Sequence, residues 1–196
     1  MTHFREVALE HASRLVNHGP TVLVTSAHGA ARNLMAAAWS MPVEFTPPRI
    51  AIVIDKKTYT RELILAGGGF GVCLPGTGLA GLTYAVGSES GRAVDKFAKY
   101  GLRARSGPVL GVPLLEDGCA AWLECRLIRE PHTEDAYDTC FAEVVAAAAD
   151  ERVFRQGHWH FDDGNSELQT IHHLGAGNFV KSGGMFNAAV AVGMRP

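Results

Sequence analysis

One stretch, residues 33–60, constrains the fold more than any other part of the chain. It holds two apolar segments, separated by Pro47 and Pro48 and followed by lysines and hydroxyl residues (NLMAAAWSMPVEFTPPRIAIVIDKKTYT). Three consecutive alanines suit a helix by propensity, but the prolines come too soon for a long helix. We therefore predict a strand over residues 34–43 that bends at its end, and a buried strand over the β-branched run 50–54. Ending side by side, they would place an apolar surface beside anion donors, as a phosphate-bearing aromatic cofactor requires.

Composition narrows the class of protein. The 196 residues suit one domain over residues 1–196, and 47% hydrophobic with 19% charged residues excludes a disordered chain. A net charge of -2 argues against nucleic acid as a partner. No stretch approaches the roughly 18 apolar residues of a membrane span, and the charged start does not resemble a signal peptide. Cys73, Cys119, Cys125 and Cys140 lack metal or disulfide spacing, so we expect buried thiols in the cytoplasm.

The rest of the chain alternates short apolar runs with Gly and Pro turns. Such a pattern predicts a mainly β fold, a closed antiparallel barrel with few short helices. We expect helices over residues 4–18, 61–66 and 93–100, and one or two helical turns over 79–86. We expect strands over residues 21–26, 70–74, 119–129 and 137–148, the last two being antiparallel partners joined by a turn at 131–135.

Two groups of basic and hydroxyl residues are candidates for holding a phosphate. Charge-assisted hydrogen bonds from Lys or Arg bind phosphate strongly, and a helix that begins near Thr60 would add free N–H groups. The alternative is that Thr58 or Thr60 only caps this helix and the lysines are solvated. No GxGxxG or P-loop motif is present. The groups are Lys56, Lys57, Thr58 and Thr60, and Ser88, Ser90, Arg92 and Lys96.

Trp39 and the histidines allow two interpretations each. Trp39, set among alanines, either stacks on a planar ligand or fills the core between small residues. His158 and His160 could share a face of a strand, whereas the neighbours His172 and His173 cannot both point inward. Nothing else completes a ligand set, so we favour surface or cofactor-edge histidines over a metal site.

Four segments, taken together, resemble the flavin reductase-like family, the FMN-binding split barrels, and within it the flavoredoxin-like branch. They are residues 33–40, 47–60, 70–76 and 90–102, within a resemblance that extends over about residues 20–149. The resemblance implies an FMN-binding split barrel, that is, a closed antiparallel Greek-key barrel. It also implies a homodimer with FMN at the interface between the subunits.

The same match assigns residues to the cofactor. The isoalloxazine and ribityl chain would be bordered by Asn33, Ala38, Trp39 and Ser40. The ring pocket would be lined by Cys73 and Leu74. The ribityl or phosphate end would lie near Lys56, Thr58, Thr60, Ser90, Arg92 and Lys96.

The activity that the resemblance implies is that of a flavin reductase. Hydride would pass from NADH or NADPH to the flavin, and electrons on to free flavin or a partner protein. No side chain is expected to be an essential acid or base, although His172, His173 or Lys96 could assist protonation. Many relatives carry Gly-Asp-His where this chain has Tyr137-Asp138-Thr139-Cys140, which leaves an FMN-binding electron carrier or flavin store as the alternative.

Overall fold

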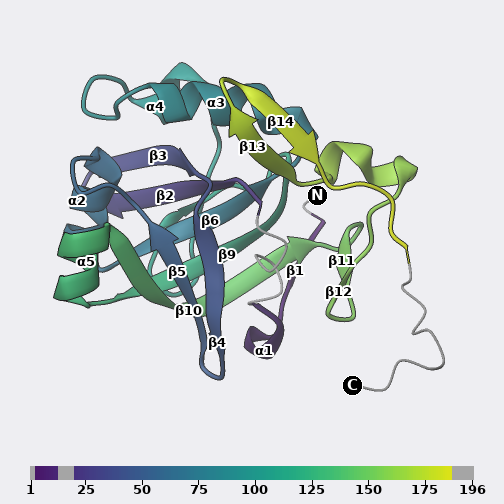
Figure 1. Ribbon diagram of the computed structural model, residues 1–196, viewed down its shortest axis with the longest axis horizontal. Helices are drawn as coiled ribbons and strands as arrows, with labels where there is room; N and C mark the ends of the chain where they lie inside the picture. The colour runs from purple at the N-terminus through teal and green to yellow at the C-terminus, as the bar shows by residue number, and fades with distance from the viewer. Residues whose placement is uncertain (1–2, 13–19, 187–196) are drawn as a thin grey trace.

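The computed structural model describes residues 3–12 and 20–186, which form one large antiparallel sheet flanked by short helices (Figure 1). Its eight strands follow the order β3-β2-β6-β9-β10-β5-β4, with β1 paired to β10. Three two-stranded sheets lie outside this path: β7–β8, β11–β12 and β13–β14. The large sheet comprises β1 Phe4–Glu6, β2 Val22–His28, β3 Ala31–Ala37, β4 Ser40–Phe45, β5 Pro48–Val53, β6 Gly69–Pro75, β9 Cys119–Ile128 and β10 Thr139–Asp150. The small sheets comprise β7 Arg105–Ser106, β8 Pro113–Leu114, β11 Phe154–Arg155, β12 His158–Trp159, β13 Ile171–Gly175 and β14 Asn178–Lys181.

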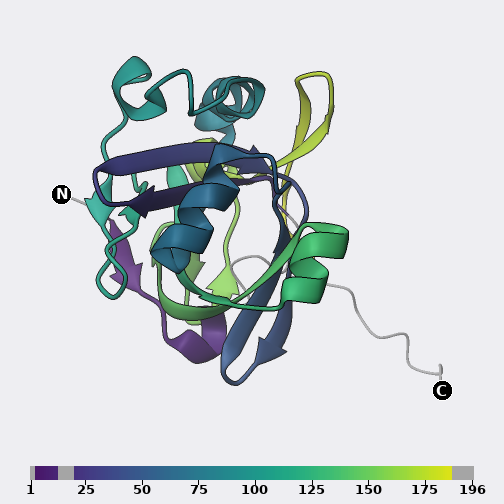
Figure 2. The ribbon, with the colours of Figure 1, turned by 90° about the vertical axis from the view of Figure 1, so that its left-hand side faces the viewer.

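The sheet curls around itself but its ladder stays open, so the prediction of a closed barrel is wrong (Figure 2). The hydrogen-bonded path runs from β3 to β4, and in the described part of the chain no pairing joins these two end strands. The predicted single strand over residues 34–43 is also two strands, interrupted at Ala38 and Trp39. Beyond that interruption β4 pairs with β5 and with no other strand among the residues described. Pro42 has no backbone donor for a second partner, and an edge strand tolerates this.

Most predicted strands are present with small changes at their ends. The strands over 119–129 and 137–148 are β9 and β10, which pair antiparallel as expected. Side chains of β2, β5, β6, β9 and β10 form the main core, among them Ile52, Phe70 and Leu123. A second cluster lies under α3 and α4 and includes Leu34, Val86 and Phe97.

Four helices surround the ends of β3 and β10. α2 (Tyr59–Gly67) begins after the cap Thr58 and ends at Gly68, whose φ of 73° suits glycine. α3 (Ala80–Ser88) follows the 3-10 turn η2 (Thr77–Leu79). The helix predicted over 93–100 is only one turn, α4 (Lys96–Lys99), because Asp95 caps Phe97 and Ala98 and Gly101 follows closely. The turn expected at 131–135 is instead α5 (Pro131–Tyr137), for which Pro131 supplies a suitable first residue.

The N-terminal segment departs most from the prediction. Within the expected helix over 4–18, residues 4–6 form β1 and only α1 (Leu9–Ala12) is helical, while residues 13–19 lie outside the described residues. Phe4 pairs with Asp150 and stacks on Trp122, with ring centroids 6.5 Å apart. These contacts with residues far away in the sequence stabilise an extended segment, and they outweigh the preference for a helix that the spacing of the apolar residues indicates. Among the described helices, none is long and apolar enough to cross a membrane.

Another 3-10 segment, η3 (Asp163–Leu168), precedes β13. Its cap Asp162 accepts a hydrogen bond from Gly164 N at 2.8 Å. The β13–β14 hairpin that follows lies near α3 in Figure 1. Thr21 Oγ1 accepts a hydrogen bond from His173 N at 2.8 Å, which fixes the hairpin against the start of β2.

Candidate functional site

β3 carries predicted site residues at both ends. Asn33 lies near its start, and Ala38 directly follows its last residue. At about 3.3 Å per residue of a strand, these positions are roughly 16 Å apart. The strand can therefore support an elongated ligand, with different chemistry at each end.

Asn33 forms the polar end of the site together with α2 and the loop after α3. It is buried, and its Nδ2 donates to Thr60 Oγ1 at 2.8 Å. Gly91 lies against the same amide, because a Cβ built on it would be 2.1 Å from Asn33 Oδ1. Only glycine allows so close an approach. The loop that carries Ser90 and Arg92 is thereby brought beside Asn33 and Thr60.

The two threonines of α2 have different partners. Thr58 Oγ1 donates to Asp55 O at 2.8 Å and accepts from Arg61 N at 3.2 Å, so it caps the helix as the simpler interpretation held. Thr60 does not cap; it faces Asn33. The first backbone N–H groups of a helix have no partner within it, and they carry its positive dipole end.

Arg92 joins the loop to the first turns of α2. Its Nη1 lies 2.6 Å from Glu62 Oε2, and its guanidinium lies 5.2 Å from the centroid of the Tyr59 ring. Ser90 Oγ accepts from Arg92 N at 3.3 Å. Both Arg92 and Glu62 are largely exposed, so this ion pair contributes little to stability and is free to exchange for another anion.

Lys96 is buried and bonded to backbone. Its Nζ donates to Leu34 O at 2.8 Å and to Val86 O at 2.6 Å, which fastens β3 to the end of α3. Burial lowers the pKa of Lys96, and the nearby Glu89 carboxylate opposes this shift. Lys96 therefore has a structural role near the polar end of the site, since it connects β3 to α3.

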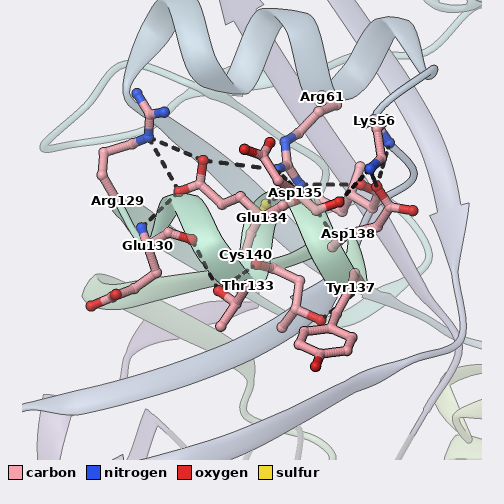
Figure 3. Close-up of polar contacts among 12 residues, drawn as sticks. Lys56, Arg61, Arg129, Glu130, Thr133, Glu134, Asp135, Tyr137, Asp138 and Cys140 are labelled. Carbon is pink, nitrogen blue, oxygen red and sulfur yellow. Dashed lines mark hydrogen bonds and ion pairs between the residues drawn. The ribbon is translucent and has the colours of Figure 1, made fainter.

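Lys56 lies at the other side of α2, next to α5 (Figure 3). Its backbone N–H donates to Asp138 Oδ1 at 3.0 Å, and its Nζ donates to Asp135 O. Its neighbour Lys57 is exposed. The structure thus brings Asn33, Thr60, Ser90 and Arg92 together, while the contacts of Lys56 lead to the junction of α5 and β10.

An apolar pocket of about 220 Å³ lies at the other end of β3. The Tyr84 and His173 rings lie 6.4 Å apart, and the His173 and Phe179 rings lie 5.0 Å apart. Ser88 also lines the pocket and leads directly into the loop of Ser90. The pocket is lined chiefly by Ala36, Ala37, Ala38, Tyr84, His173 and Phe179.

Ala38 also borders a second hollow, of about 380 Å³, which includes Trp39 and Ser40. Trp39 is 74% exposed, so it is not a core tryptophan in the single chain. Ser40 Oγ is buried, and no described residue gives it a hydrogen-bond partner. An exposed indole beside an unsatisfied hydroxyl fits a planar ligand with polar edges.

Cys73 and Leu74 lie in the core of the sheet. Both are fully buried, and Cys73 Sγ accepts from Leu115 N at 3.3 Å. Burial raises the pKa of Cys73 to about 12, against the opposing effect of the Leu115 N–H. The thiol is therefore protonated, and neither side chain reaches the surface of the single chain.

Several residues of the site were not assigned from the sequence. Gly91 is not among the expected cofactor-binding residues, although a glycine between Ser90 and Arg92 is a signal for a close backbone approach. Tyr84 and Phe179 had no signal, because the hairpin that brings Phe179 to α3 is far away in sequence. Among the described residues, no group of three His, Cys, Asp or Glu side chains could hold a metal ion.

Comparisons with known proteins agree with this architecture. The chain is 58% identical over 185 residues to YddH, an uncharacterised protein of Escherichia coli (strain K12), covering 93% of this chain and 97% of YddH. It superimposes with a TM-score of 0.92 on the FMN-binding domain of a flavin reductase-like enzyme from Shewanella baltica OS155. Identity there is 40%, over 96% of this chain and 98% of the other. A flavoredoxin from Methanosarcina acetivorans gives a TM-score of 0.70 at 26% identity, over 89% and 90% of the two chains.

The family model described as the flavin reductase-like domain matches residues 14–168, which is most of the chain and includes the whole of β3, α2 and the loop of Gly91. Together with the strongly similar Shewanella structure, this match establishes that the chain belongs to the flavin reductase-like family.

Proposed function

We propose that this protein binds FMN along β3 and acts as a flavin reductase that uses NADH or NADPH. The observation that carries the proposal is the arrangement along one strand. At one end lie the apolar pocket and, sharing Ala38 with it, the hollow that contains the exposed Trp39 indole; at the other end lie Asn33, Thr60 and the Gly91 loop. The phosphate would lie by Thr60, Ser90 and Arg92, and the ring between Ala38 and Trp39.

The residues present fit this cofactor. The Ser40 hydroxyl, which is buried and has no hydrogen-bond partner among the described residues, borders the same hollow as Trp39. Asn33 is held by Thr60, and glycine at position 91 lets the loop of Ser90 and Arg92 pack directly against its amide. Arg92 supplies a charge-assisted donor at the phosphate end, because its exposed pairing with Glu62 is weak.

When bound, FMN would supply the redox chemistry, namely uptake of hydride from a reduced nicotinamide and release of electrons to free flavin or to a protein acceptor. The protein orients the ring, limits access of water and holds the phosphate. His173 lines the apolar pocket that adjoins the hollow of Trp39 at Ala38, and from there it could assist protonation. Cys73 is excluded from proton transfer because its raised pKa keeps the thiol neutral and its side chain is buried.

The test is to mix the FMN-loaded protein with NADH or NADPH without oxygen and follow flavin absorption at about 450 nm. We expect rapid bleaching, and recovery of the colour when free flavin and then air are added. A yellow protein that neither nicotinamide bleaches within minutes would contradict the reductase and match an FMN-binding electron carrier. A protein that retains no FMN would contradict both the flavin reductase and the electron carrier.

We further propose that two copies associate through β4. This edge strand exposes Met41 and Phe45, with relative exposures of 58% and 69%, next to Trp39. Edge strands with an exposed apolar row are usually covered in solution. The row begins at Trp39, so the second copy would complete the wall of the ring pocket.

A further inference from the structure

The junction between α5 and β10 carries a buried ionic network that the proposed chemistry does not use (Figure 3). Arg61 and Glu134 are each only 3% exposed, and Arg61 Nη2 lies 3.8 Å from Glu134 Oε2. Glu134 also accepts from Arg129 Nε at 3.2 Å and from Glu130 N at 2.8 Å. Buried charges are costly unless their partners are held in place, so α5 has a fixed position on the sheet.

Arg61 connects this network to the polar end of the proposed site. It follows Thr60 directly in α2, and its Nη1 donates to Ile54 O at 3.2 Å and to Cys140 Sγ at 2.9 Å. Its Nη2 donates to Glu134 O at 3.2 Å. The first turn of α2 is therefore held from one side by the end of β5, the start of β10 and α5.

Asp138 holds the turn that leads into α2. Its φ of 53° ends α5 in the left-handed conformation and aims its carboxylate at the turn 55–58. Oδ1 accepts from Lys56 N at 3.0 Å and lies 3.8 Å from Lys56 Nζ. Asp55, in the same turn, accepts from Lys57 N at 2.7 Å, and Thr58 completes the turn as the cap. The turn is thus fixed by a contact with a residue about eighty positions away.

We propose that Asp138 is a positioning residue for the phosphate end of the FMN site. By holding Lys56 N it fixes the turn 55–58, and with it the free N–H groups of α2 and the Thr60 hydroxyl that faces Asn33. This inference rests on the proposed function. It also gives the segment Tyr137–Cys140 a role, since here the segment supports the cofactor from α5.

The test compares two substitutions that both tolerate the left-handed conformation. Asp138→Gly keeps the backbone but removes the acceptor for Lys56 N, whereas Asp138→Asn keeps an acceptor oxygen. The readout is the ratio of the dissociation constants of riboflavin and FMN, because the two differ only in the phosphate. Asp135→Asn is the matched control, since it removes one nearby charge while Lys56 bonds only the backbone carbonyl of Asp135.

We expect Asp138→Gly to lower the ratio about tenfold by weakening FMN alone, while Asp138→Asn and Asp135→Asn stay within about twofold of wild type. A purely structural role would weaken both flavins equally or lower the melting temperature without moving the ratio. An unchanged ratio in Asp138→Gly overturns the positioning role while the proposed function stands. A wild-type protein that does not prefer FMN to riboflavin overturns the proposed function and this role with it.

Discussion

At the scale of single residues, the proposed site depends on Gly91, whose lack of a side chain lets its loop approach Asn33. Gly91→Ala would place a Cβ 2.1 Å from Asn33 Oδ1 and 2.5 Å from Asn33 Cγ, so either the loop or the amide must move. Movement of either separates Ser90 and Arg92 from Thr60. We expect FMN affinity to fall about tenfold, measured by quenching of flavin fluorescence on titration.

The control for this substitution is Gly81→Ala in α3. A Cβ there meets nothing within 4 Å, and alanine favours a helix. We expect FMN affinity to stay at the wild-type value and the melting temperature to stay equal or rise. Equal FMN affinity in Gly91→Ala and Gly81→Ala would show that the close approach of Gly91 to Asn33 is irrelevant to the cofactor.

Residue types at the site were readable from the sequence, but their partners were not. Thr60, Ser90 and Arg92 are expected at the phosphate end and Asn33 at the ring and ribityl chain with Ala38, but the structure brings Asn33 to Thr60 and the Gly91 loop instead. Lys96 was also assigned, yet its ammonium bonds two backbone carbonyls, because a fold can bury a lysine wherever carbonyls converge. Whether carbonyl groups from different elements meet at one lysine depends on how strands and helices pack, and this cannot be predicted from a local sequence pattern.

At the scale of elements, strands were more predictable than the segments that join them. β9 and β10 show apolar runs long enough to identify directly, whereas α5 contains His, Thr, Glu and Asp and was read as a turn. α5 is stabilised by Glu134, which pairs with the buried Arg61 of α2 and with the more exposed Arg129 just after β9. The stability of such a helix depends on tertiary contacts rather than on propensity.

The role of Glu134 gives a pH-dependent prediction. Burial favours the neutral acid, but the Glu130 N–H, Arg129 and Arg61 outweigh it, so the pKa of Glu134 is lowered from its ordinary value of 4.5. A carboxyl with a lowered pKa in the folded state stabilises the fold above its ordinary pKa. That contribution is lost as the pH falls through the folded-state pKa.

We therefore expect Glu134→Gln to lower the free energy of unfolding by roughly 3 kcal/mol at neutral pH. The difference from wild type should shrink as the pH falls below 4.5 and on through the lowered pKa of Glu134, because folded wild type then also becomes neutral at this position. Urea unfolding at a series of pH values measures both the loss of unfolding free energy at neutral pH and its decrease at low pH. Asp117→Asn, in the exposed pair with Arg103, serves as the control and should cost under about 0.5 kcal/mol. A difference that stays constant with pH would contradict the ionised, paired state of Glu134.

At the scale of the whole molecule, the second copy that we propose would cover both the open edge of the sheet and the proposed ring pocket. The path ends at β4, whose exposed apolar row starts beside Trp39. The sequence predicted closure of the sheet because short strands with Gly and Pro turns are typical of barrels. It could not show that the chain leaves an edge open, since closure depends on whether β3 and β4 meet.

Association through that edge can be tested by adding charge to it. Phe45→Glu should convert a dimer to a monomer, measured by light scattering after size-exclusion chromatography, because a carboxylate cannot be buried without a partner. FMN affinity should fall in parallel, since Trp39 would lose the second copy that covers it. Leu174→Glu on β13 is the control: Leu174 is 68% exposed, almost as much as Phe45, but lies away from β4. If both variants keep the wild-type mass, β4 is not the dimer contact; if wild type itself is a monomer that binds FMN tightly, one chain suffices for the site.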